Sequence, residues 1–295
     1  MSGEGTAGGG RGATAAAVEP LELRPIKGPS AFGGSLRRFF SLLWLQSVTE
    51  FKAGYLHTSF GYLWSLARPL MLFGVLLVVF TQVFRLGSEV PNYPVLLLFN
   101  IVLFGFFQEA TNSAVTSVVS QEGIVRKTQF PRLVIPMATV LTGLLNLGMN
   151  LIAVLIFMLA FGVSPTWTWL FFPIILAALF VLTAALSMLL SSLYVRYRDV
   201  AIMWTVIATA LFYGTPVLYP FEIVPDEFRD ILAVNPLTPL FAQARHWIID
   251  PGAPGAVQAV GGWGHLVAPM ALFVAICALG VWVFKREAPR VAEEL

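Results

Sequence analysis

Residues 167–194 read WTWLFFPIILAALFVLTAALSMLLSSLY and contain no charged side chain. An uncharged apolar run long enough to cross the ~30 Å hydrocarbon layer of a bilayer is typical of a transmembrane helix. The stretch therefore predicts a chain that is embedded in a membrane.

Similar apolar runs recur along the chain. The 295 residues are 57% hydrophobic and 12% charged, about half the charged fraction of an average soluble domain. A water-facing surface is difficult to build from so few charges. The sequence predicts an all-α, integral membrane six-helix bundle with spans near residues 64–84, 95–119, 135–161, 167–194, 201–219 and 266–284.

Two segments precede the first span. Residues 1–30 are rich in Gly, Ala and Thr, and this composition predicts a disordered tail ahead of one transmembrane domain over residues 31–295. From 36 to 55, apolar residues recur at spacings of three and four, and cations lie on another face. The pattern predicts an amphipathic helix in the membrane interface. A helix that binds a partner or packs in the core is the alternative.

The positive charges give an orientation. Of the 18 lysine and arginine residues, 15 are assigned to one side of the expected membrane: seven up to Arg68 near the start of the first span, and the others after the last span or in alternate connections. Arg85, Arg229 and Arg245 are assigned to the other side. The side richer in Lys and Arg faces the cytoplasm. Both termini are therefore expected in the cytoplasm, in support of an even number of spans.

The connection over residues 220–265 is the longest. Its amphipathic part, 228–249, is interrupted by Asn235, Pro236 and Pro239, which suggests two short helices. These helices are expected to be re-entrant if protein shields them or if they line a cavity, because lipid-exposed irregular backbone leaves hydrogen bonds unmade.

The sequence lacks the residue patterns for ATP binding, metal binding and nucleic-acid binding. The sequence has no G-x-x-x-x-G-K-[ST] phosphate loop, so this chain is not expected to bind ATP by itself. Cys277 is the only cysteine, and His57, His246 and His265 lack metal-ligand spacing, so no metal site is expected. The net charge is only +2, and the basic residues are distributed among short connections instead of forming one patch. Nucleic-acid binding is therefore not expected.

Glu109 is the acidic residue that falls well inside an expected span. Such carboxylates are costly in lipid and tend to face a bundle interior or a wet cavity. Polar residues share its side of the helix at spacings of three and four: Asn112, Ser113, Thr116, Ser117 and Ser120. The stripe is either the lining of a substrate path or a seam that hydrogen-bonds to another helix. A proton relay is disfavoured because no further ionisable residue is expected at this depth.

Aromatic side chains supply further candidates for a path. Phe73, Phe107 and Tyr213 fall deep in their expected spans, where rings either pack in an apolar environment or stack on sugar rings in a passage. The sequence leaves their direction open.

Three local patterns carry a resemblance to a known family. They are YLHTSFGYLWSLARPL (55–70), RKTQFPRLVIP (126–136), and YVRYRDV (194–200) followed by TPVLYP (215–220) and NPLTP (235–239). In this order the chain resembles the permease subunit of type-2 ABC exporters of the polysaccharide branch, which includes O-antigen, capsule and teichoic-acid exporters. Arg68 stands where members of the family often have an uncharged residue.

The resemblance implies an assembly and a cargo. It implies a homodimer of permeases in the bacterial inner membrane, bound to two copies of a separate ATPase that holds ATP and Mg²⁺. The implied cargo is a lipid-linked polysaccharide moved from the cytoplasmic to the outer face. The rival functions are a permease for drugs or other lipids, a passive channel, and a membrane-embedded glycosyl- or acyltransferase, for which Glu109 alone is poor support.

The resemblance also implies two functional regions. The residues implied to contact the ATPase are Arg126, Lys127, Phe130, Pro131 and Arg132. The alternative is that Arg126, Lys127 and Arg132 only mark this connection as cytoplasmic. The gate at the outer face falls on residues 226–249, with Asp226, Phe228, Arg229 and Arg245 as candidates.

Overall fold

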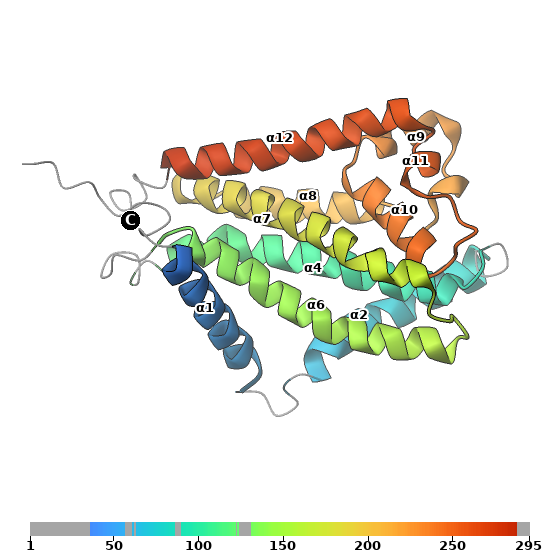
Figure 1. Cartoon of the computed structure of the whole chain (residues 1–295), viewed down its shortest axis with the longest axis horizontal. Coiled ribbons are helices and arrows are strands. Elements are labelled where there is room, and N and C mark those ends of the chain that lie inside the picture. The colour runs from blue at the N-terminus through green and yellow to red at the C-terminus, as the bar shows by residue number, and fades with distance from the viewer. Residues whose placement is uncertain are drawn as a thin grey trace, which may run out of the picture.

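The computed structural model describes residues 36–56, 61, 63–85, 90–121, 123 and 131–287, and these residues form helices joined by short connections (Figure 1). Five helical segments are apolar and long enough to cross a membrane, which confirms an all-α membrane bundle. They are α2 (Leu63–Val78) with the π-helical turn η1 (Val79–Val83), α4 (Tyr93–Ser120), α6 (Val134–Ala160), η2 (Trp167–Phe171) with α7 (Phe172–Arg196), and α12 (Trp263–Glu287).

Helix α4 lies at the centre of the bundle. It contacts α2, α6, α7 and α8. Of an 18-residue apolar stretch in each helix, 78% is buried in α4, compared with 6% in α2 with η1 and 11% in α12. Its residues between Val95 and Phe107 supply much of the main hydrophobic core. The outer helices consequently expose apolar side chains on their far sides, as expected of a chain surrounded by lipid.

Small residues bring the long helices close together. Gly143 of α6 faces Ala110 and Phe106 of α4, and Gly280 of α12 lies against the backbone carbonyl group of Ala185 in α7. Since a membrane helix gains little from burying apolar surface, close approach of backbones at small residues is a principal source of association.

The helix found at the expected span 201–219 is shorter than that span. Helix α8 (Val200–Gly214) has 15 residues. At 1.5 Å per residue it is about 22 Å long, less than the ~30 Å hydrocarbon layer. The helix ends because Pro216 favours an extended conformation at Thr215, where φ is −107° and ψ is 148°. A sixth crossing at this place remains a prediction.

The connection after α8 folds into a group of short helices. These are η3 (Phe221–Ile223), α9 (Asp226–Ala233), α10 (Leu237–Ile248) and α11 (Ala256–Ala259). The break between α9 and α10 falls at Val234–Pro236, as the sequence suggested, whereas Pro239 lies inside the first turn of α10. All of them lie at one end of the bundle, the α9 end (Figure 1).

Helix α1 (Leu36–Leu56) lies at the opposite end, the α1 end, and leaves the bundle at an angle (Figure 1). Its apolar side is divided between two environments. Phe39 and Leu43 are buried against Leu133, Val134 and Phe284, whereas Phe40 and Trp44 are exposed. One flank of the helix therefore packs on the chain, and the other is available to a membrane interface or a partner.

Candidate functional site: a polar strip on α4 and the two ends of the bundle

An exposed polar strip runs along α4. Glu109, Ser113, Thr116 and Ser120 are exposed, although most of this helix is buried. They recur at spacings of three and four, so they share one side of the helix. The four helices that pack on α4 leave this strip uncovered in the single chain.

Two other residues expected in the strip turn toward the protein. Ser117 is buried, and its hydroxyl donates to the carbonyl oxygen of Ala114 at 2.8 Å. Asn112 is half-buried, and its Oδ1 is a buried acceptor with no hydrogen-bond partner among the described residues. The exposed strip is therefore narrower than the polar pattern of the sequence.

The aromatic candidates have different positions. Phe107 is 1% exposed, edge-on to Trp204 of α8, whose Nε1 donates to Thr111 Oγ1 at 3.1 Å. Phe73 is buried edge-on to Phe157, with ring centroids 5.4 Å apart. Tyr213 is exposed on α8. Within the single chain Phe73 and Phe107 are packing residues, whereas the ring of Tyr213 is uncovered.

The end of α1 approaches the polar strip. The hydroxyl of Tyr55 donates to Asn146 Oδ1 of α6 at 2.6 Å. Burial raises the pKa of Tyr55; its hydrogen bond with Ser65 of α2 opposes this rise, and the carboxylate of Glu109 adds to it. Tyr55 is therefore protonated at neutral pH and stands near Glu109. Sequence reasoning missed this junction, because Tyr55 counts there as one apolar position of an amphipathic helix.

The backbone after α8 is held by side chains of α4. Asn100 Nδ2 donates to the carbonyl oxygens of Pro216 and Val217, at 3.1 and 3.2 Å, and the hydroxyl of Tyr93 donates to that of Leu218 at 2.7 Å. Protein thus shields irregular backbone that follows a membrane helix, as such backbone requires.

A second link joins two motifs that are far apart in sequence. Asn235 Nδ2 donates to Thr215 Oγ1 at 2.8 Å, and Asn235 Oδ1 accepts from the backbone N–H of Leu237 at 3.0 Å. Asn235 therefore starts α10 and attaches it to the segment that ends α8.

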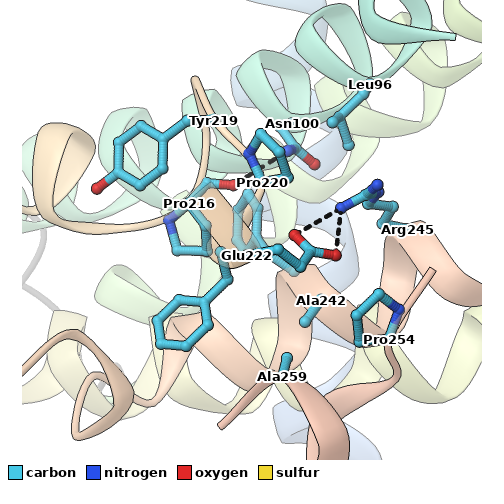
Figure 2. A pocket seen from close by; sticks show the side chains of 12 residues that line it. Leu96, Asn100, Pro216, Tyr219, Pro220, Glu222, Ala242, Arg245, Pro254 and Ala259 are labelled. Atoms are coloured by element: carbon cyan, nitrogen blue, oxygen red, sulfur yellow. Dashed lines mark hydrogen bonds and ion pairs between the residues drawn. The ribbon is translucent and has the colours of Figure 1, made fainter. Parts of the chain in front are cut away.

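Arg245 and Arg229, two of the outer-gate candidates, form a charged latch with Glu222, and Figure 2 shows the contact between Glu222 and Arg245. Arg245 Nη1 contacts both carboxylate oxygens of Glu222, at 2.8 and 3.0 Å. Arg229 Nη2 donates to the backbone carbonyl oxygen of Glu222 at 2.8 Å, and Nη1 pairs with Asp226 at 2.5 Å. The structure thus joins three of the four candidates through Glu222, which the sequence did not single out, and leaves Phe228 exposed.

A small cavity lies beside the latch, lined among others by Asn100, Tyr219, Glu222 and Arg245 (Figure 2). Its volume of about 20 Å³ admits a molecule the size of water. The cavity cannot hold a sugar ring, so the latch is a structural contact and not a cargo pocket.

The α1 end contains part of the expected ATPase contact. Pro131 is buried and Arg132 is half-buried, and their carbonyl oxygens accept from the backbone N–H groups of Val134 and Ile135 at 2.9 and 3.3 Å. Arg126, Lys127 and Phe130 lie outside the described residues, as do the 1–30 tail and His57. In the described part of the chain, no three His, Cys, Asp or Glu side chains group in a way that would hold a metal ion.

Most of the chain is similar to known membrane proteins. Residues 41–248, from α1 to the end of α10, match the family model described as ABC-2 type transporter. An O-antigen export system permease protein RfbA from Klebsiella pneumoniae is 29% identical over 217 residues, which cover 73% of this chain and 83% of the relative. A protein of the same name from Myxococcus xanthus is 28% identical over 209 residues, covering 70% and 80%. The chain belongs to the ABC-2 type transporter family of membrane proteins.

Proposed function

We propose that this chain is the transmembrane subunit of an ATP-driven exporter that moves a lipid-linked polysaccharide from the cytoplasmic to the outer face of a bacterial inner membrane. Two copies of the chain enclose the passage, and two copies of a separate ATPase, with ATP and Mg²⁺, bind at the α1 end. The export function named for the relatives from K. pneumoniae and M. xanthus supports this cargo.

The observation that carries the proposal is the exposed strip on α4. A charged side chain in the middle of a membrane helix costs about 2.5–3.5 kcal/mol against lipid, so Glu109 needs water or protein in front of it. A second copy of the chain, placed with its own strip opposite, would enclose a passage lined by carboxylate and hydroxyl groups. Such groups can exchange hydrogen bonds with a chain of sugars, whereas an apolar drug or lipid would gain nothing from them.

The two ends of the bundle then have separate roles. The connection around Pro131 and Arg132, together with α1, receives the movement of the ATPase. The latch of Glu222 with Arg245 and Arg229 holds the short helices at the outer exit and opens when the cargo leaves.

Thiol accessibility tests the passage. In a Cys277→Ser background, Ser113→Cys should react with a membrane-impermeant maleimide and form cross-links between two copies, because both strips face one aqueous passage. Ile156→Cys is the matched control, since Ile156 is exposed on the outer side of α6 in an apolar surrounding. An unreactive Ser113→Cys in a complex that still exports glycan would exclude the strip as the path.

A further inference from the structure

We infer that Glu50 is a positioning residue that fixes α1 to the two central helices α4 and α6, so that these three elements move together at the α1 end. The inference rests on the proposed exporter function, because it names the contact through which a force on α1 reaches the helices beside the passage.

The carboxylate of Glu50 accepts hydrogen bonds from three directions. Gln46 Nε2, one turn earlier in α1, donates to Oε1 at 2.9 Å. Gln121 Nε2, directly after the end of α4, donates to the same oxygen at 3.0 Å. Thr142 Oγ1 of α6 lies 3.4 Å from Oε2. A carboxylate is an acceptor only, and here each oxygen has donors from a different helix.

Further contacts lie beside Glu50, and each joins α1 to one neighbouring helix only. Gln46 Nε2 also contacts Gln121 Oε1, at 3.3 Å, and Thr142 Oγ1 lies 3.2 Å from the carbonyl oxygen of Ser47. The hydroxyl of Ser47 is fully buried and lies 3.2 Å from the carbonyl oxygen of Ala138. Glu50 is therefore the centre of a polar patch and the member that touches both α4 and α6.

Contacts along α1 lie on either side of this half-buried patch. Phe39 and Leu43, earlier in α1, pack on Leu133 and Val134 at the start of α6, and Tyr55, later in α1, donates a hydrogen bond to Asn146 of α6. Apolar packing alone is adaptable and would permit α1 to slide, whereas hydrogen bonds to a charged acceptor specify one register and are about twice as strong as neutral ones.

The same helix provides a matched control. Thr49 is the neighbour of Glu50, but its side chain is exposed and bonds the carbonyl oxygen of Leu45 in its own helix, at 2.7 Å. Glu50→Ala removes the hub, Glu50→Gln keeps an acceptor oxygen for Gln46 and Gln121, and Thr49→Ala changes a polar side chain outside the patch.

The experiment measures export for each ATP hydrolysed. Cells that carry each variant with its partner ATPase are scored for surface glycan, by periodate oxidation and hydrazide labelling, and their membranes for ATP hydrolysis. Glu50→Ala should lower the ratio at least about tenfold, because it removes every hydrogen bond to the carboxylate and the loss of one such charge-assisted bond already corresponds to a factor of about ten. Glu50→Gln should retain part of it, and Thr49→Ala all of it. A normal ratio in Glu50→Ala overturns the inference. Failure of the unaltered chain to export glycan would instead refute the proposed function.

A covalent link separates positioning from folding. Ser47→Cys with Thr142→Cys, in the Cys277→Ser background, joins α1 to α6 by oxidation at a point where the Thr142 hydroxyl lies 3.2 Å from the backbone carbonyl oxygen of Ser47. When added to Glu50→Ala, the link should restore export, and reduction should abolish it again. If the link forms but export stays low, or if it stops export in the chain that retains Glu50, then α1 must move relative to α6 and the inference is wrong.

Discussion

At Glu109, membrane insertion and the proposed transport make opposite demands. The strip to which Glu109 belongs is exposed in the single chain, and Tyr55 lies near Glu109. A side chain whose only purpose was stability would not be a carboxylate at this depth, because the charge itself is unfavourable there.

Glu109→Leu should therefore lower export while the amount of chain inserted in the membrane stays the same or rises, because removal of a charge relieves about 2.5–3.5 kcal/mol of insertion cost. Glu109→Gln should keep more of the export, since it retains hydrogen-bonding capacity. Quantitative immunoblotting of membranes, set beside surface glycan, measures both effects. Equal export by the leucine variant would show that the carboxylate has no part in the passage.

Asn235 is a residue at which two motifs meet. Asn235→Ala loses the bond to Thr215 and the cap of α10, so the free energy of unfolding should fall by about 1–2 kcal/mol. Thermal unfolding in detergent, followed by tryptophan fluorescence, checks this value. Thr209→Ala provides the comparison, because the exposed Thr209 hydroxyl bonds only the carbonyl oxygen of Thr205 in its own helix. A similar loss in both variants would contradict a special role for Asn235.

At the scale of elements, the sequence identified five long helices because each is a predominantly apolar run long enough to cross the membrane. It failed at the end of α8, since the apolar residues continue past Gly214 while the helix stops before Pro216. Hydropathy indicates whether a segment is stable in the membrane, but it does not indicate the backbone conformation. The proline restricts that conformation at the residue before it.

The site was predictable to the same limited degree. The polar side of α4 was visible as a periodic pattern, but Ser113 and Ser117 are equivalent in that pattern, and only the neighbouring helices bury one and expose the other. Glu50 was missed because the apolar residues of α1 dominated its interpretation. The spacing of Gln46 and Glu50 by four residues was the available signal.

The contact of α12 with α7 gives a prediction at this scale. A methyl group on Gly280 would overlap the backbone carbonyl group of Ala185, and backbone cannot rotate away as a side chain does. Gly280→Ala should push the helices apart and cost about 1–3 kcal/mol of stability. Gly264→Ala lies in the same helix with nothing within 4 Å, so it should be neutral or slightly stabilising. Thermal unfolding of the two purified variants decides the matter, and equal melting temperatures would refute the close contact.

For the whole molecule, the charge distribution and the proposed exporter require the two ends of the chain on one face of the membrane. Epitopes added at the N-terminus and after Leu295 should both be accessible only from the cytoplasm, and Asp226→Cys should react with an impermeant thiol reagent from outside, in a Cys277→Ser background. Labelling of intact and permeabilised cells makes the comparison. Epitopes found on opposite faces would mean an odd number of crossings and would rule out the topology.

The short α8 changes how thick the insulating barrier is beside it. Its helical part covers about 22 Å, and side chains of α4 hold the non-helical backbone that follows it. In the proposed exporter, an apolar wall about a quarter shorter than the ~30 Å hydrocarbon layer would shorten the low-dielectric distance that a hydrated polymer has to pass. Part of the work of export would then come from a proline that stops a helix early, and not from ATP.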